Sequence, residues 1–351
     1  MKNGCRGIVG LGISIISVIG ITLQAAPEPK WANAPDLPLE LARAAGIYFP
    51  ANDRFYAMGG RMSENRGDDM TTPYEYNSAT NRWAYKTAPF PDNQVSNMAC
   101  GVLSVNEKPY IYCVGGIAAG TIHATPRVFR YDPIADRMET AGIDRWSEDA
   151  PDTLPGGFTV ANNKLYIIGG LTIGNTASNR IWEFDPNRPA GSQWSKKAAT
   201  LPAPLCFLPV TAIENEIYIA GGGAFEPCKL TETTDSYVYD PVADVLSPIA
   251  KIPRATAETQ AVAVAGEMWV LGGGRTAPNP SAEVNIYNPE TGKWRQGPAM
   301  SSGQRSFAVA SDGTRVLLAG GYSATALLKT SRVIEEVSKP GSEPVAGQGE
   351  K

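Results

Sequence analysis

Few side chains in this sequence are of the types that catalysis or metal binding requires. The 351 residues include a single histidine, His123, which excludes metal sites built from two or three histidines. Arg43, Glu258 and Arg305 share a position, each 14 to 16 residues before a Gly-Gly pair. An arginine guanidinium binds a carboxylate through two parallel hydrogen bonds, and a glutamate can accept and donate a proton. These three residues are the first candidates for a ligand site.

Further candidates follow the Gly-Gly pairs. Arg61 and Tyr322 come directly after their pairs, and Arg275 comes after Gly272-Gly273-Gly274. Loops at corresponding points carry other charged residues, namely Glu64, Arg66, Asp68, Asp69 and Glu226. His123 occupies such a loop, where we expect it to be exposed to solvent. In the alternative interpretation, Arg43 and Arg305 pair with neighbouring carboxylates or carbonyl groups and hold no ligand. We expect no metal site and no cofactor.

The Gly-Gly pairs belong to a repeat, which must position these candidates. Close variants of the segment 164–170 (KLYIIGG) occur six times, and five of them have an aromatic residue three positions before the first glycine. The first glycines are residues 59, 115, 169, 221, 272 and 320, so that the period is 48 to 56 residues. A period of this length indicates a repeat architecture.

Each repeat reads as four short strands separated by turn residues. In the third repeat we expect strands at 157–161, 164–169, 180–185 and 193–197, punctuated by Asn-Asn, Gly-Gly and Asp-Pro. A tryptophan near the end of some repeats is predicted to pack between neighbouring units. These residues are Trp83, Trp194 and Trp294, with Met138 and Leu246 in the second and fourth repeats. The glycine pairs are predicted to be structural, because a phosphate-binding loop needs a following helix and none is expected.

This pattern resembles the kelch repeat family, whose members carry a double glycine, a downstream aromatic residue and a later tryptophan. The resemblance covers residues 31 to about 338. It implies an all-β fold, a six-bladed kelch-type β-propeller with four antiparallel strands per blade. The last repeat lacks a fourth strand after 332–337, whereas 30–35 reads as a fourth strand with nothing before it. The N-terminal strand should therefore close the last blade and remove exposed sheet edges.

In such a propeller the start of each innermost strand faces the channel mouth. By spacing, the residues there are Arg43, Ala99-Cys100, Thr153-Leu154, Leu205-Cys206, Glu258 and Gln304-Arg305. The loops that carry Arg61, Arg275 and Tyr322 open onto the same face. All six candidates are thus expected to meet around the channel axis.

The two ends of the chain read differently from the repeats. Residues 1–25 contain Lys2 and Arg6 followed by an apolar run, and are predicted to be a signal peptide, with an uncleaved membrane anchor as the alternative. The propeller is expected to span residues 26–340, and 341–351 to form a disordered tail. Without residues 1–25 the chain has 29 basic and 35 acidic residues, which argues against nucleic acid as a partner.

Four cysteines remain beyond the expected signal peptide, and their placement suggests two disulfide bonds. Cys206 and Cys228 are expected at the same end of one blade, and Cys100 and Cys113 lie at equal distances from a turn near Asn106-Glu107. Buried free thiols are the alternative. The chain has no acceptor site for N-glycosylation, and we therefore expect export from a bacterial cytoplasm to the periplasm or the outside. We expect the protein to be a monomer.

Three functions fit the sequence. The first is a binding module that takes an acidic sugar, glycan or peptide at the channel mouth. The second follows from similarity to the exported six-bladed kelch N-acetylneuraminate mutarotases: a sugar mutarotase or epimerase in which Glu258 exchanges a proton and Arg43 or Arg305 holds the substrate. The third is a protein-interaction scaffold in an envelope assembly. We favour the binding module; mutual salt bridges among Arg43, Arg305 and Glu258 would argue against an acidic-ligand site or an enzyme.

Overall fold

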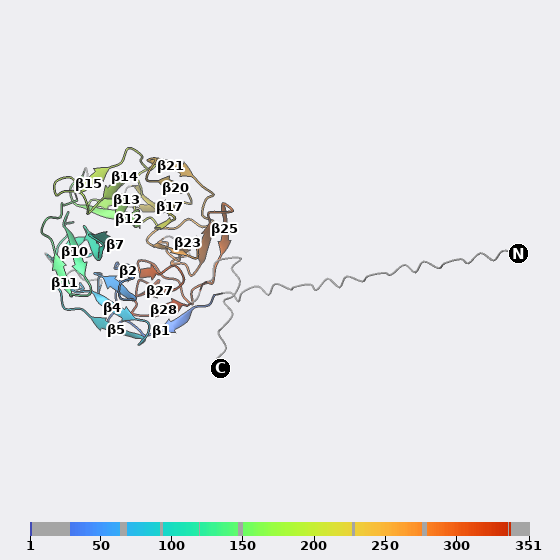
Figure 1. Cartoon of the computed structure of the whole chain (residues 1–351), viewed down its shortest axis with the longest axis horizontal. Coiled ribbons are helices and arrows are strands. Elements are labelled where there is room, and N and C mark those ends of the chain that lie inside the picture. Colours follow the sequence, from blue (N-terminus) through green and yellow to red (C-terminus); the bar gives the residue numbers. More distant parts are fainter. Residues whose placement is uncertain are drawn as a thin grey trace.

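The protein is a six-bladed β-propeller (Figure 1). The computed structural model describes residues 1, 29–63, 69–91, 94–118, 120–146, 150–226, 229–275, 279–335 and 337. Six four-stranded antiparallel sheets are arranged around one axis, and each is a blade. The predicted fold class is therefore confirmed.

Each blade takes its strands in chain order from the channel outward. Blade 1 contains β2 (Ala45–Phe49), β3 (Arg54–Met58), β4 (Tyr74–Asn77) and β5 (Arg82–Tyr85). Blade 2 contains β7 (Ala99–Val105), β8 (Lys108–Val114), β10 (Val128–Asp132) and β11 (Arg137–Glu139). Blade 3 contains β12 (Thr153–Ala161), β13 (Lys164–Thr172), β14 (Ala177–Phe184) and β15 (Trp194–Lys196).

The remaining blades follow the same plan. Blade 4 contains β16 (Val210–Ile213), β17 (Glu216–Ala220), β20 (Ser236–Asp240) and β21 (Val245–Pro248). Blade 5 contains β22 (Ala261–Val264), β23 (Glu267–Leu271), β24 (Val284–Asn288) and β25 (Lys293–Gln296). Two short two-stranded sheets add to the loops, β6 (Gln94–Ser96) with β9 (Ile117–Ala118), and β18 (Gly223–Glu226) with β19 (Lys229–Glu232).

The two ends of the chain share blade 6. This blade contains β26 (Ala308–Ser311), β27 (Val316–Ala319), β28 (Ser331–Ile334) and, outermost, β1 (Ala32–Ala34). Ala32 is opposite Val333 and Ala34 is opposite Ser331 in an antiparallel pair (Figure 1). The N-terminal strand closes the last blade, as the sequence predicted. The expected signal peptide at 1–25 and the tail at 341–351 lie outside the described residues, apart from Met1.

The hydrophobic core lies between the blades. Each innermost strand contacts the next around the ring, and β26 contacts β2 to complete it. Large side chains of adjacent blades meet in shared clusters; Tyr56 of blade 1 and Tyr131 of blade 2, for example, have ring centroids 6.2 Å apart. Burial of each sheet face against its neighbour is the main favourable contribution to such a fold.

The tryptophans of the outer strands fasten one blade to the preceding one. Their rings pack against the clusters between blades, as predicted. Each indole Nε1–H also donates to a carbonyl in the linker that leaves the preceding blade. The bonds are Trp31 to Pro298 (2.8 Å), Trp83 to Pro35 (3.0 Å), Trp194 to Asp144 (3.2 Å) and Trp294 to Ala250 (2.6 Å). The tryptophan position therefore supplies a hydrogen bond as well as apolar surface.

Blades 2 and 4 use a carboxylate in place of the indole. Met138 and Leu246 take the tryptophan position there and have no N–H to donate. Asp136 instead accepts from the backbone N–H of Thr87 (2.8 Å), and Asp244 accepts from that of Ala198 (2.9 Å). Both donors, Thr87 and Ala198, belong to the linker from the preceding blade. The indole N–H that donates to the preceding linker in four blades is thus replaced, in blades 2 and 4, by a carboxylate that accepts from that linker.

The glycine pairs lie where one blade meets the next. The first glycine of every pair has a positive φ; that of Gly169 is 66°. A Cβ atom on Gly169 would lie 2.2 Å from the carbonyl oxygen of Leu205 in the following blade. Only glycine combines this conformation with such a close approach. The predicted structural role of the pairs is therefore confirmed.

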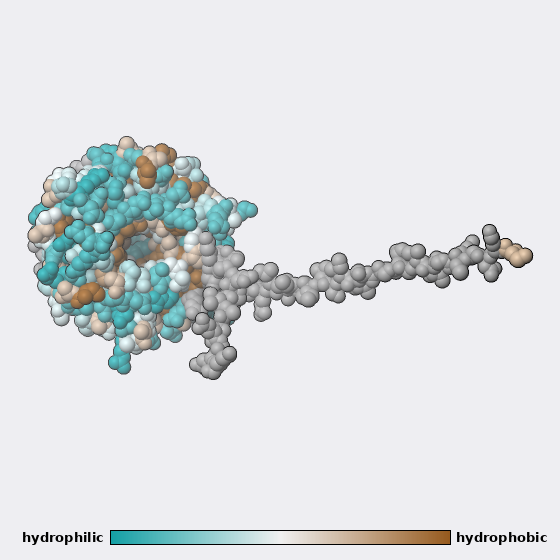
Figure 2. Space-filling view, in the orientation of Figure 1, coloured by the Kyte–Doolittle hydropathy of each residue, from teal (hydrophilic) through white to brown (hydrophobic). Residues whose placement is uncertain are grey.

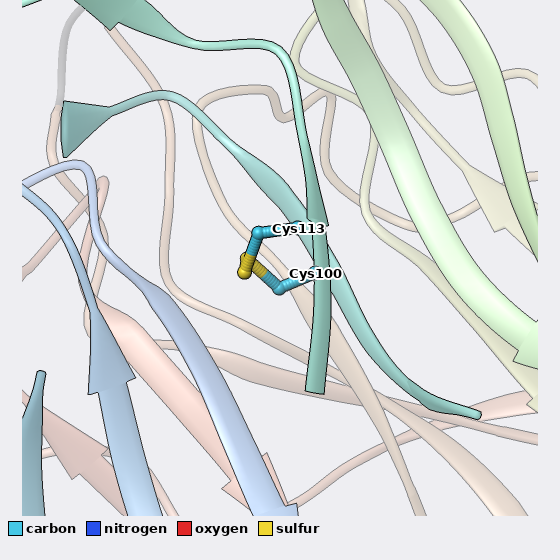
Figure 3. Close-up of a disulfide and its surroundings, with 2 residues drawn as sticks. All are labelled: Cys100 and Cys113. Atoms are coloured by element: carbon cyan, nitrogen blue, oxygen red, sulfur yellow. A yellow bond between two sulfur atoms is a disulfide. The ribbon is translucent and has the colours of Figure 1, made fainter. Parts of the chain in front are cut away.

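One of the two expected disulfide bonds is present. Cys100 on β7 and Cys113 on β8 are directly opposite each other, with their Cα atoms 4.2 Å apart, and they are bonded (Figure 3). The turn between the strands has positive φ at both Asn106 and Glu107, as tight two-residue hairpins require. Cys206, by contrast, is a buried free thiol, so the expected bond to Cys228 is not formed; Cys228 itself lies outside the described residues.

We expect reduction of Cys100–Cys113 to lower the free energy of unfolding by about 3 kcal/mol, because the bond closes a loop in the unfolded chain. The two cysteines are 13 residues apart in sequence. Urea unfolding with and without reductant measures the difference. A Cys100→Ser, Cys113→Ser double variant should not respond to reductant, and equal midpoints for the oxidised and reduced wild type would contradict the prediction.

Within the described residues, no helix is long and apolar enough to cross a membrane.

Candidate site at the channel mouth

The centre of the candidate site is Glu258, a buried carboxylate between two arginines. Its side chain is 1% exposed. Oε2 accepts a charge-assisted hydrogen bond from Arg305, and Oε1 lies 3.3 Å from the guanidinium of Arg275. The two cations make a buried charge tolerable. The Arg305 side chain is 19% exposed and that of Arg275 is 46% exposed, so Arg275 remains open to solvent.

Tyr322 joins Arg43 to this cluster. Its backbone pairs with that of Arg305 through hydrogen bonds of 3.0 and 2.8 Å. The guanidinium carbon of Arg305 lies 4.6 Å from the ring centroid of Tyr322, and that of Arg43 lies 5.8 Å from it. The buried ring therefore contacts two cations, an arrangement that stabilises guanidinium groups. Five of the six predicted candidates thus form one connected group.

Arg61, the sixth candidate, lies at the same end of the propeller but has another partner. It pairs through its backbone with Ala42, as Tyr322 does with Arg305, and its Nε lies 3.9 Å from Asp69. His123 is 70% exposed and its Nδ1 lies 3.2 Å from Asp152, in keeping with the exposed loop that the sequence indicated. The other charged loop residues, Glu64, Arg66, Asp68 and the side chain of Glu226, lie outside the described residues.

A second set of residues lines the mouth at one repeated backbone position. In every blade, the residue after the glycine pair forms backbone hydrogen bonds with a residue ahead of, or at the start of, the innermost strand. We call the residue that follows this partner the rim residue. The six rim residues are Arg43, Asn97, Pro155, Phe207, Glu258 and Ser306. All six line the central cavity.

Five of the six rim residues have a left-handed backbone. Their φ angles lie between 52° and 62°, and Pro155 is the exception. A side chain with a Cβ rarely adopts this conformation, which costs on the order of 1 to 3 kcal/mol and is concentrated at functional sites. The repetition of this strain around one opening marks the rim as a candidate for function.

The left-handed residues are linked into what we call the rim circuit. In four of the five, the backbone N–H donates to the backbone carbonyl of the rim residue in the preceding blade. The bonds are Glu258 to Phe207 (3.2 Å), Ser306 to Glu258 (2.7 Å), Arg43 to Ser306 (2.7 Å) and Asn97 to Arg43 (3.1 Å). Because the backbone groups are used in this way, the rim is held rigidly and its side chains line the opening.

Sequence spacing alone missed four of the six rim residues by one to three positions, and found only Arg43 and Glu258. It indicated Ala99-Cys100, Thr153-Leu154, Leu205-Cys206 and Gln304-Arg305, where the structure has Asn97, Pro155, Phe207 and Ser306. The interval from the rim residue to the first glycine of the pair is 14 residues in blades 3 to 6. It is 16 residues in blade 1 and 18 in blade 2, because the hairpins there are longer. Counting from the residue after each glycine pair, with allowance for hairpin length, would have identified them.

The rim opens into a central cavity of about 420 Å³. Figure 2 shows a face of the ring that is hollowed at its centre and surrounded by hydrophilic residues. The opening has two chemically different halves. The linked charged residues belong to blades 5, 6 and 1, whereas the rim residues of blades 3 and 4 are Pro155 and Phe207. Such a volume suits a small molecule or the end of a chain.

Cys206 lies beside the site but is chemically inert. The thiol donates to the carbonyl of Gly223 at 3.2 Å. Burial, reinforced by the negative charge of Glu258, raises the pKa of Cys206 to about 12. A thiol of this kind is protonated at neutral pH and is a poor nucleophile. In the described part of the chain, no three His, Cys, Asp or Glu side chains are grouped as metal ligands.

Comparison with known proteins identifies the family. Residues 104–321 match the model of the KLHDC2/KLHL20/DRC7 Kelch-repeats domain. The chain belongs to the kelch-repeat family. Kelch propellers are in general binding or protein-interaction modules, and the kelch propeller here has its candidate site where the blades converge.

The kelch relatives share the repeats at low identity. The chain is 27% identical over 320 residues to Kelch-like protein 15 of Danio rerio, covering 83% of this chain and 48% of that protein. It is 26% identical over 174 residues to Beta-scruin of Limulus polyphemus, covering 48% and 19% of the two chains. The match thus spans about half the length of Kelch-like protein 15 and about a fifth of the length of Beta-scruin. The solved structure of YjhT, 16% identical, covers 87% of this chain and 97% of its own, with a TM-score of 0.67, and shares the fold.

Proposed function

We propose that this kelch propeller is a binding module that takes a carboxylate-bearing ligand, an acidic sugar, glycan or peptide, at its channel mouth. The observation that carries the proposal is that Glu258, a buried carboxylate that lines the cavity, holds two arginines beside it. Glu258 uses one N–H of Arg305, and a guanidinium has five. Arg275 is half exposed. The remaining N–H groups can therefore form bidentate hydrogen bonds to an incoming carboxylate.

The same geometry favours binding over the mutarotase alternative. A general base must offer a carboxylate oxygen to the substrate proton. Both oxygens of Glu258 face arginines, and its side chain is buried. A salt bridge is present between Glu258 and Arg305, and by the expectation drawn from the sequence it argues against an acidic-ligand site as well as against an enzyme. It weakens the case for turnover, but the uncommitted N–H groups of the arginines leave anion binding supported.

Export from the cytoplasm is part of the proposal. The buried bond between Cys100 and Cys113 supports it, since disulfides persist in oxidising compartments and are rare in the cytosol. Fractionation of cells expressing the full chain tests the location, and N-terminal sequencing of the mature protein tests cleavage near residue 25. Recovery of the full-length chain in the cytosolic fraction would reject this part of the proposal.

The arginine pair can be tested with a matched control on the same blade. Arg275 and Arg295 are comparably exposed, at 46% and 50%, and each pairs with a buried glutamate, but Arg295 lies on the outer strand β25. We expect Arg275→Gln to weaken binding of an acidic sugar such as glucuronate about tenfold, the cost of one charge-assisted hydrogen bond. Arg295→Gln should have no effect. Ligand-observed NMR and calorimetry measure the affinities.

Neutral glucose is the ligand control. Equal binding of glucose and glucuronate, or equal losses in the two arginine variants, would contradict a carboxylate site. An NMR anomer-exchange assay on the same samples tests turnover. Catalysed exchange that disappears in Glu258→Gln would establish the mutarotase alternative instead.

A further inference from the structure

The β18–β19 sheet of blade 4 is fixed beside the rim residue of blade 5. The side chain of Leu230 on β19 is 6% exposed and belongs to a buried cluster that includes Cys206 and Ala257. The backbone of Cys206 pairs with that of Gly223, the first residue of β18, through hydrogen bonds of 2.9 and 2.8 Å. Ala257 directly precedes Glu258 in the chain. Apolar packing and backbone pairing therefore hold this sheet next to the carboxylate at the centre of the candidate site.

The last residue of β19 makes a direct contact with Arg275. Oε1 of Glu232 accepts a hydrogen bond from the backbone N–H of Arg275, and the two atoms are 2.5 Å apart. The residues are 43 positions apart in the chain and belong to different blades. A hydrogen bond from a backbone N–H to a carboxylate is charge-assisted and is among the stronger hydrogen bonds in proteins. It holds the backbone from which the Arg275 side chain reaches Glu258, whose Oε1 lies 3.3 Å from the guanidinium.

The residue before Arg275 is fixed as well. The backbone N–H of Gly274 donates to the carbonyl of Ala257 at 2.8 Å, and a Cβ atom on Gly274 would lie 2.2 Å from Oδ1 of Asn279. That oxygen in turn accepts from Arg254 at 2.9 Å. An exposed arginine has many rotamers, so a fixed backbone on both sides of its N–H limits where the guanidinium can reach.

We propose that Glu232 is a positioning residue for the carboxylate site. It holds the backbone of Arg275 so that the guanidinium stays beside Glu258 and within reach of a ligand at the channel mouth, and it acts only through Arg275. Blade 4, whose own rim residue is the apolar Phe207, thereby contributes to anion binding from its β18–β19 sheet. The inference rests on the carboxylate site proposed in the preceding section.

The charge of Glu232 provides a test in which positioning and electrostatics predict opposite signs. A carboxylate near an anion site repels an anionic ligand, so its removal would strengthen binding if charge were its only effect. Glu232→Gln removes the charge but keeps an oxygen that can accept from Arg275, whereas Glu232→Ala removes both. We expect Glu232→Ala to weaken binding of glucuronate roughly fivefold, the value of one net hydrogen bond, and Glu232→Gln to bind at least as tightly as the wild type. Calorimetry measures the affinities.

Two further variants show whether the effect passes through Arg275. In the Arg275→Gln background, Glu232→Ala should cause no additional loss, because the side chain that it positions is already absent. Glu216→Ala is the charge control: it removes an exposed carboxylate from the start of β17 in the same blade and should leave the affinity unchanged. Amide exchange read by ¹⁵N NMR tests the contact without ligand. The amide of Arg275 should exchange slowly in the wild type and Glu232→Gln, and faster in Glu232→Ala.

The positioning role is overturned if Glu232→Ala binds glucuronate as tightly as the wild type or more tightly, or if it causes the same loss with and without Arg275. Unchanged exchange of the Arg275 amide in Glu232→Ala overturns it as well. If the wild type itself does not bind glucuronate, the carboxylate site fails, and the amide exchange alone decides whether Glu232 holds Arg275.

Discussion

Replacement of Glu258 by glutamine should lower the free energy of unfolding by about 3 kcal/mol and at the same time make the protein respond strongly to added anions. The loss is that of a buried ion pair from which one partner is removed, which leaves the cations uncompensated. Glu258 is 3% exposed and serves both Arg275 and Arg305. An anion that occupies the space between the two guanidinium groups would replace the missing carboxylate charge.

Sulfate is a suitable probe for this effect. Binding to the folded state alone stabilises a protein in proportion to the logarithm of ligand concentration. Thermal unfolding of Glu258→Gln across a sulfate series, at constant ionic strength, should recover a larger part of the lost stability than the wild type gains. Constant ionic strength separates site binding from general screening.

Glu267→Gln is the matched control for Glu258→Gln. Glu267 is also buried, at 2% exposure, and pairs with Arg295 in the same blade. Its loss should destabilise the protein by a similar amount, but only one arginine is left, half exposed on an outer strand. We expect a much weaker sulfate response. Equal sulfate responses in the two variants would show that the mouth has no special capacity for anions.

Substitution of Gly46 by alanine should lower the free energy of unfolding as much as Glu258→Gln does, for a purely steric reason. The backbone at Gly46 is not left-handed, so alanine is conformationally allowed. A Cβ atom there would nevertheless lie 2.3 Å from the carbonyl oxygen and 2.4 Å from the nitrogen of Val309 in blade 6. Backbone atoms of a neighbouring strand cannot rotate away as a side chain can. We expect a loss of about 3 kcal/mol, at the upper end for overpacked cores.

Gly174→Ala provides the comparison for Gly46→Ala. The nearest atom to a Cβ on Gly174 is the hydroxyl oxygen of Thr172, at 3.7 Å, an ordinary van der Waals distance. Urea unfolding should show no appreciable loss for this variant. A Gly46→Ala protein as stable as the wild type would mean that blades 1 and 6 separate at little cost. Contact between β2 and β26 would then contribute little to closing the ring.

The architecture could be predicted from the sequence because each repeat contains residues that mark its own turns and contacts. The double glycines mark the contacts between blades, the Asp-Pro and Asn-Pro steps mark the turns, and the tryptophan before Ala32 marks the closing strand. Such features depend on nearest-neighbour chemistry, which a repeated pattern displays six times. Cys100 and Cys113 were also placed opposite each other correctly, because the hairpin register follows from their distances to the turn. The pair of Cys206 with Cys228 was wrong because it relied on proximity between loops.

The sequence by itself determined the fold, its closure and the gathering of Arg43, Glu258, Arg275, Arg305 and Tyr322 at one end of the propeller. Only the tertiary structure decided which residues form ion pairs and hydrogen bonds with one another. That Glu258 lies buried between two arginines, and that Asp136 and Asp244 replace missing indoles, depends on contacts between residues more than 15 positions apart in the chain. The exception that Pro155 makes, with no N–H to donate, likewise has meaning only relative to the rim circuit formed by the other blades. The sequence period shows which positions are equivalent in the six blades. The partner of the charged or hydrogen-bonding group at each position depends on which residues lie beside it in the folded protein.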